Sequence, residues 1–147
     1  MEAVERFGDD IQTVHFAIES ASPKIQQLLN KPINLEKALS LFSLFTARGI
    51  KNINTNFMFG LPTENDDDIA QNIAMACRIR AINPKIRMVP FIYTPQPKDD
   101  IIPAFPAYYE KIEFSFENMA TVDLSPNRSR YLTPSTRPWM SEADINF

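Results

Sequence analysis

Apolar and polar positions alternate in a regular way from residue 11 to residue 94. Three runs in this stretch are rich in residues that favour β-structure: Thr13–Ile18, Ile50–Phe59 and Ile86–Thr94. In the second run, Asn54 and Asn56 alternate with apolar side chains, which is the period of a strand with two different faces. These runs predict three β-strands.

Helix-start and helix-stop residues separate the runs. Ser22 precedes Pro23, the arrangement of an N-cap followed by proline at the first helical position. Asn34 is a good cap for a second helix, with Glu36 in a first turn where the helix dipole favours an acid. Gly49 is expected to end that helix.

A third helix is predicted to begin after its cap, Asn65, with the acidic run Asp66–Asp68 in its first turn. Asn83–Pro84 is expected to end it. Helical spacing predicts one apolar face, which consists of Ile69, Ile73 and Ala76. Cys77 lies on the same helix and is expected to be a small core residue.

Polar side chains occupy one face of each of the first two predicted strands. His15 and Glu19 share a face of the first strand, and Asn54 and Asn56 share a face of the second. A parallel strand buried on both sides is normally apolar on both sides. We therefore expect the apolar faces to pack on helices and the polar faces to line a cavity.

The order strand, helix, strand, helix, strand with short loops predicts an α/β protein with parallel strands joined by crossovers. The ends of all three strands then lie at one edge, where such proteins place their chemistry. After Pro95 the chain becomes Pro-rich and irregular. We divide it into a strand–helix domain over residues 1–98 and a partly helical C-terminal extension over residues 99–147.

Charge and composition remove several functional classes. The net charge is −3 and no basic stripe occurs, so nucleic-acid binding has no electrostatic support. No apolar run approaches the roughly 20 residues of a membrane span. The single cysteine, Cys77, rules out a disulfide framework within the chain and makes a cytoplasmic setting the expectation.

Three short segments resemble the radical S-adenosylmethionine (SAM) superfamily. They are Val14–Ser22, similar to the family's Gly-x-Glu-Ser-Gly-Ser strand end, Phe57–Glu64, similar to Phe-Gly-x-Pro-x-Glu, and Phe91–Pro97, similar to Tyr-Thr-Pro-x-Pro. Together they cover about residues 11–98, and the branch they most resemble often carries a cobalamin-binding domain. The resemblance implies half of a partial TIM-type barrel, containing its fourth to sixth strands.

The resemblance also implies a set of cofactor contacts. Glu19 and Ser20 lie where the family meets the ribose or the methionine part of SAM, and a carboxylate suits ribose hydroxyls because these are donors. Asn56, Met58 and Gly60 lie on the strand that packs against the adenosine, and a glycine there lets the backbone approach the ligand. Thr94 flanks the adenine.

The family's Cys-x3-Cys-x2-Cys motif does not occur in this chain. Without three thiolates the [4Fe–4S] cluster is not held, so we expect the chain to be inactive alone. Both ends resemble interrupted helices, which favours a fragment of a longer parent enzyme. In that parent, SAM, the cluster, a small-molecule substrate and cobalamin are the expected ligands.

Two other interpretations stay open. The first is a non-catalytic binding or assembly module, because a three-strand piece leaves edges that pair with a homo-oligomer or with the rest of the barrel. The second is a barrel enzyme that uses Glu19 and Glu64 as acid and base. Glu19 also has a purely structural alternative, in which it caps the next turn or pairs with Lys24.

Overall fold

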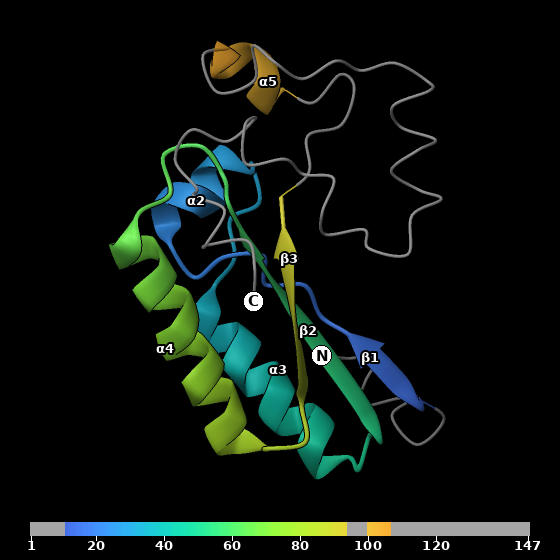
Figure 1. Cartoon of the computed structure of the whole chain (residues 1–147). Coiled ribbons are helices and arrows are strands. Elements are labelled where there is room, and N and C mark those ends of the chain that lie inside the picture. Colours follow the sequence, from blue (N-terminus) through green and yellow to red (C-terminus); the bar gives the residue numbers. More distant parts are fainter. Residues whose placement is uncertain (1–10, 94–99, 107–147) are drawn as a thin grey trace, which may run out of the picture. The chain divides into compact units, whose positions relative to one another are not determined.

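The computed structural model describes residues 11–93 and 100–106 (Figure 1). The described residues fall into two compact units. The first holds residues 11–59 and 64–91, and the second holds residues 60–63, 92–93 and 100–106. The division into residues 1–98 and 99–147 stays a prediction.

The described chain contains three strands and four helices, in the order β-α-α-β-α-β-α. Their bounds are β1 Thr13–His15, α2 Pro23–Leu28, α3 Leu35–Ala47, β2 Asn52–Phe59, α4 Asp66–Ile82, β3 Arg87–Ile92 and α5 Ile101–Ala104. The strands form one sheet in the order β1-β2-β3, and all three point the same way (Figure 1). The predicted α/β class with a parallel sheet is therefore confirmed.

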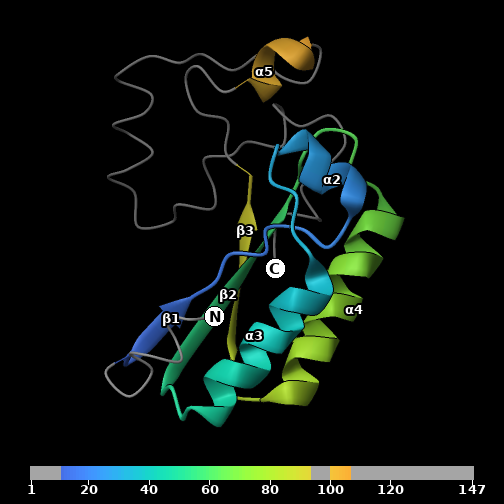
Figure 2. The same ribbon diagram turned by 180° about the vertical axis from the view of Figure 1, so that it is seen from behind.

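Helices α3 and α4 pack side by side on one face of this sheet, as both views show (Figures 1 and 2). The β2 side chains that face them are Ile53, Thr55 and Phe57, each at most 4% exposed. The opposite face of β2 carries Asn54 and Asn56, as predicted. Helices α3 and α4 therefore leave the polar face of the sheet open (Figures 1 and 2).

Aromatic side chains form the centre of the core. Phe42 of α3 is fully buried and makes edge-to-face contacts with Phe16 and Phe45, with ring centroids 5.7 and 6.3 Å apart. Pairs of this geometry stabilise a fold by about 0.5–1.5 kcal/mol beyond the contribution of the apolar area that they bury. Met75 and Ile79 of α4 belong to the same cluster. The core thus joins both helices to the apolar face of the sheet.

The helix ends follow the predicted local chemistry. The Ser22 side chain accepts from the backbone of Ile25 at the start of α2, and Asn34 accepts from Lys37 at the start of α3. Gly49 follows the end of α3 with φ 69°, a conformation that a residue with a Cβ adopts only with strain. These capping predictions are confirmed.

The strands are shorter than predicted. The β1 strand ends at His15 rather than Ile18, although Phe16 N still donates to Asn54 O. Just after this end the Thr55 hydroxyl donates to Phe16 O at 2.8 Å, and a single further bridge pairs Glu19 with Phe57. β2 begins at Asn52 rather than Ile50. β3 spans Arg87–Ile92, whereas the predicted strand spans Ile86–Thr94, and Thr94 lies outside the described residues.

The predicted apolar face of α4 is wrong in part: Ile69 is half-buried and Ala76 packs against the core, but Ile73 does not. Ile73 is 57% exposed and Cys77 is exposed, so neither is a core residue. The buried stripe lies on another side of the helix and consists of Asp68, Asn72, Met75 and Ile79. Hydrophobicity alone could not find this stripe, because its first two members are polar.

Candidate functional site

The turn after β1 places Glu19 against β2. Glu19 N donates to Asn56 O at 3.1 Å, and Met58 N donates to Glu19 O at 2.6 Å. The residue has φ 63°, which costs a side-chain-bearing residue about 1–2 kcal/mol. Strained backbone of this kind persists where the surroundings hold it, and it is common at functional sites.

The Glu19 carboxylate is held by two side chains. Asn56 Nδ2 donates to Oε2 at 2.6 Å, and Lys31 Nζ lies 2.7 Å from Oε1. His15 Nε2 lies 3.0 Å from Asn56 Oδ1, within hydrogen-bond distance. The row His15–Asn56–Glu19–Lys31, which we call the Glu19 cluster, joins the open face of the sheet to the segment after α2.

The Glu19 cluster is sheltered but reachable. The Glu19 side chain is 13% exposed, whereas the Lys31 side chain is 54% exposed. Asn56 is buried, with 5% of it exposed. A carboxylate oxygen accepts more than one hydrogen bond and an ammonium has three donors, so the pair keeps capacity for a ligand.

The other predicted site residues lie in different surroundings. Met58 shares the face of Asn56 on β2 and is half-buried. The Ser20 hydroxyl is fully buried and donates to Asn72 Oδ1 at 3.2 Å. Gly60 has φ 75° and belongs to the second unit, and Thr94 lies outside the described residues. The structure therefore brings Glu19 and Asn56 into contact.

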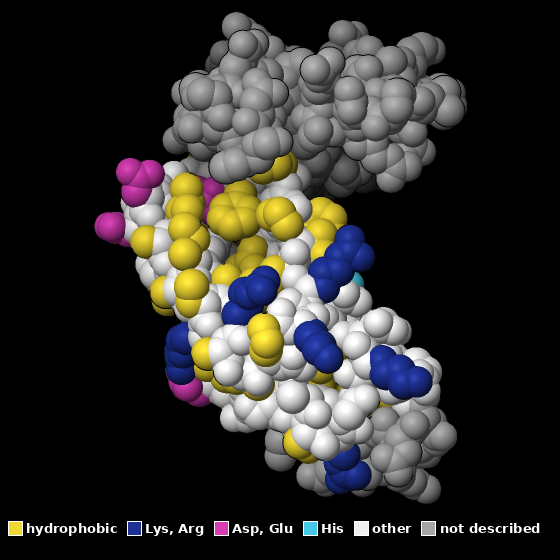
Figure 3. All heavy atoms as spheres, turned by 60° about the horizontal axis from the view of Figure 1, so that its bottom comes forward, with side chains coloured by type: hydrophobic (Ala, Val, Ile, Leu, Met, Phe, Trp, Pro, Cys, Tyr) yellow, Lys and Arg dark blue, Asp and Glu magenta, His cyan; other side chains and the backbone are white. Residues whose placement is uncertain are grey.

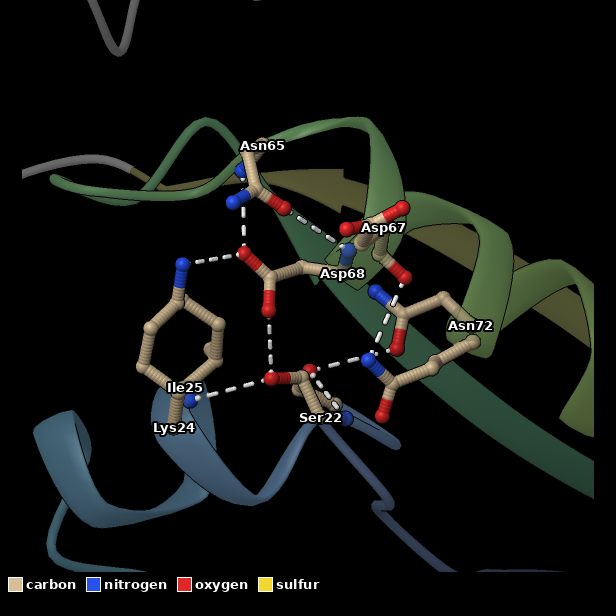
Figure 4. Close-up of polar contacts among 9 residues, drawn as sticks. Ser22, Lys24, Ile25, Asn65, Asp67, Asp68 and Asn72 are labelled. Carbon is tan, nitrogen blue, oxygen red and sulfur yellow. Dashed lines mark hydrogen bonds and ion pairs between the residues drawn. The ribbon is translucent and has the colours of Figure 1, made fainter.

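A second polar cluster lies at the start of α4, centred on Asp68 (Figure 4). Ser22 Oγ donates to Asp68 Oδ1 at 2.6 Å, and Lys24 Nζ lies 2.5 Å from Oδ2. Asn65 and Asp68 form a capping box, in which each side chain accepts from the other's backbone. Lys24 thus pairs with Asp68, and Glu19 pairs with Lys31 rather than with Lys24, which the structural alternative had named.

The electrostatics of Asp68 follow from these contacts. Burial opposes ionisation and by itself raises the pKa of the Asp68 carboxyl. Hydrogen bonds from Lys24, Ser22 and the backbone of Asn65 outweigh burial, so the pKa lies below its usual value. The carboxylate is therefore ionised at neutral pH and holds α2 and α4 together as a charged acceptor.

Sequence reasoning missed Lys31, Asp68 and Asn72. Lys31 lies twelve positions after its partner Glu19 and follows α2, so no local spacing connects them. Asp68 and Asn72 are four positions apart and therefore share the buried face of α4. Their spacing could have indicated this, but their hydrophobicity could not.

Residues 11–93 and 100–106 lack the features of a metal centre or of a membrane span. No group of three or more His, Cys, Asp or Glu residues there is arranged to hold a metal ion. No helix in that part of the chain is long and apolar enough to cross a bilayer. Lys and Arg side chains are spread over the face shown in Figure 3 rather than gathered into a stripe.

The described sheet is parallel and the Glu19 cluster follows the end of β1, and parallel α/β proteins place their chemistry at that edge of the sheet. The family model of the radical SAM superfamily matches residues 1–76, which is more than half of the chain. The chain belongs to the radical SAM superfamily. No curated protein and no solved structure matches it. The resemblance is confirmed at the level of the superfamily, and the cobalamin-associated branch stays a prediction.

Proposed function

We propose that this chain forms part of the SAM-binding side of a radical SAM barrel, with Glu19 as the central ligand contact. The observation that carries the proposal is the Glu19 cluster, in which Asn56 and Lys31 hold a carboxylate in the turn after β1. Ser20, Met58, Gly60 and Thr94 keep their predicted roles as further contacts in this proposal.

The cluster suits the chemistry of SAM. The methionine part of SAM carries an ammonium and a carboxylate, and its ribose carries two hydroxyl donors. Glu19 accepts from an ammonium or from hydroxyls, and the half-exposed Lys31 offers a positive charge to a carboxylate. The Glu19 carboxylate and the Lys31 ammonium lie 2.7 Å apart. They therefore offer a negative charge to the ammonium of SAM and a positive charge to its carboxylate.

The residues of this chain do not fit the iron–sulfur cluster of the family. Such a cluster needs three thiolates, and the chain has one cysteine, Cys77, which is exposed on α4. We therefore infer that the 147 residues do not cleave SAM reductively without cysteines from further polypeptide. The proposed contribution of this chain is to bind and orient SAM.

Titration calorimetry of the 147-residue chain with SAM tests the proposal. Glu19→Gln keeps the shape of the side chain and removes its charge, so we expect SAM to bind about 10–100-fold more weakly, the loss of a hydrogen bond to a charged group. The control is Glu36→Gln, which breaks the exposed ion pair with Arg78 between α3 and α4. Its affinity should equal that of the wild type.

Two results would overturn the proposal. One is wild-type protein that binds neither SAM nor S-adenosylhomocysteine at millimolar concentration. The other is a Glu19→Gln variant that folds and binds SAM as tightly as the Glu36→Gln control.

A second function, assembly, is favoured by the sheet edges. In the described part of the chain, β1 and β3 are the outer strands of a three-stranded sheet, and Phe91 on β3 is 45% exposed. An outer strand with an exposed aromatic side chain is a template for further strands. We propose that the strands that pair with β1 or β3 come from the rest of the barrel or from a second copy of the chain.

Sedimentation equilibrium tests assembly. A concentration-dependent dimer that Phe91→Lys weakens supports pairing between copies at this edge. A wild-type chain that stays monomeric at all concentrations removes self-assembly and leaves the rest of the barrel as the partner.

A further inference from the structure

Asn72 is a buried polar residue whose burial the helix itself does not explain. It lies in α4 one turn after Asp68 and is 1% exposed. Its Nδ2 atom has no hydrogen-bond partner among the described residues. An unpaired buried donor is unfavourable. The contacts of the amide oxygen, Oδ1, must therefore offset this cost.

The other end of Asn72 binds the turn that follows Glu19. Ala21 N donates to Asn72 Oδ1 at 2.6 Å, and Ser20 Oγ donates to the same oxygen at 3.2 Å. The carbonyl of Ser20 in turn accepts from Gln26 Nε2 at 3.0 Å. The two residues directly after Glu19 are therefore held by α4 and α2, whereas the backbone of Glu19 itself is held by β2.

Asp68, one turn earlier on α4, has contacts of a different kind from those of Asn72. The contacts of Asp68 go to helix starts, namely the Ser22 cap of α2 and the Asn65 cap of α4, so helix capping accounts for them. The described hydrogen bonds of Asn72 touch no helix end of α4 and go to the Glu19 turn alone.

We propose that Asn72 is a positioning residue for Glu19: one buried carbonyl oxygen on α4 fixes the Ser20–Ala21 backbone and thereby keeps Glu19 in its left-handed conformation with the carboxylate at Asn56. The functional consequence rests on the proposed SAM-binding function, but the positioning itself does not. Removal of the carbonyl frees the two donors of the turn, and the left-handed Glu19 then relaxes away from Asn56.

The test compares Asn72→Leu with Ile79→Val in the 147-residue chain. Leucine has a similar size and no acceptor. Ile79 lies on the same buried stripe of α4, is fully buried and belongs to the core cluster, so its variant controls for general loosening of the helix. Both variants are compared with the wild type by amide hydrogen exchange and by SAM titration.

The exchange measurement reads the position of Glu19 without any ligand. Met58 N donates to Glu19 O, so the protection of this amide reports whether Glu19 stays in place. In Asn72→Leu we expect the amides of Ala21 and Met58 to exchange about tenfold faster than in Ile79→Val, the loss expected for one hydrogen bond. Equal protection of Met58 in the two variants overturns the inference.

SAM binding is the second readout. We expect Asn72→Leu to bind SAM about tenfold more weakly than Ile79→Val. A wild type that does not bind SAM refutes the proposed function, and the exchange measurement then decides the positioning role by itself. If Asn72→Leu does not fold, the wild type decides, because an Ala21 amide that exchanges as fast as an exposed one shows that Asn72 does not hold the turn.

Discussion

Replacement of Asp68 tests how the start of α4 is held to the start of α2. The carboxylate accepts from Ser22 Oγ at 2.6 Å and from Asn65 N at 2.9 Å, and it pairs with Lys24. Asp68→Ala removes all three contacts at once. The matched control is Asp67→Ala, because Asp67 belongs to the same first turn of α4 but is exposed.

The magnitude follows from the partners. Loss of the hydrogen bond from Asn65 N, the reciprocal half of the capping box, costs about 1 kcal/mol, and loss of a charged acceptor for the buried Ser22 hydroxyl costs about 1.5–3 kcal/mol. The half-exposed Lys24 adds less than about 1 kcal/mol because water screens it. We expect Asp68→Ala to lower the free energy of unfolding by about 3–4 kcal/mol, and Asp67→Ala to lower it by less than about 1 kcal/mol.

Urea unfolding followed by circular dichroism measures both variants, and pH separates charge from shape. The pKa of Asp68 is lowered in the folded state, so its stabilisation is complete above the unfolded value of about 3.9 and is lost as the pH falls through the folded pKa. Asp68→Asn removes that dependence, so its deficit against the wild type should shrink on acidification below about pH 4. A deficit that is independent of pH, or an Asp68→Ala cost below that of Asp67→Ala, would refute the reasoning.

The remaining predictions concern the core and one helix end. Phe42→Ala should lower the free energy of unfolding by about 3–5 kcal/mol in urea titrations, because Phe42 is fully buried between two aromatic partners. Ile73→Gln should change the melting temperature little and Ile79→Ala should lower it strongly, whereas equal effects would restore the predicted face of α4. Gly49→Ala should cost about 1 kcal/mol in chemical denaturation although nothing lies near an added Cβ, because φ is 69°; an unchanged midpoint would contradict this.

The features that the sequence predicted best are decided within a few residues. The cap of α2 depends on Ser22, Pro23 and the backbone just after them, and the ends of α3 depend on Asn34 and Gly49 in the same way. Strand faces were predictable because side chains alternate strictly along a strand. Such signals need no knowledge of which elements meet.

The partners of polar side chains were not predictable, because they depend on contacts between distant elements. Glu19 meets Asn56 across 37 positions and Ala21 meets Asn72 across 51. The polar stripe on α4 misled the assignment of its buried face, since Asp68 and Asn72 lie where hydrophobic spacing predicts solvent. A helix that buries polar residues is recognised only once their partners are known.

The turn from Glu19 to Ser22 belongs to two polar clusters at once. Glu19 contributes to the cluster on the open face of the sheet, and Ser22 contributes to the cluster at the start of α4. The intervening Ser20 and Ala21 are bound by Asn72. Successive residues of one short turn therefore have partners on different elements, and Glu19 has a positive φ in this turn. For this reason we expect a substitution at Asn72, the α4 residue that binds this turn, to alter the position of Glu19.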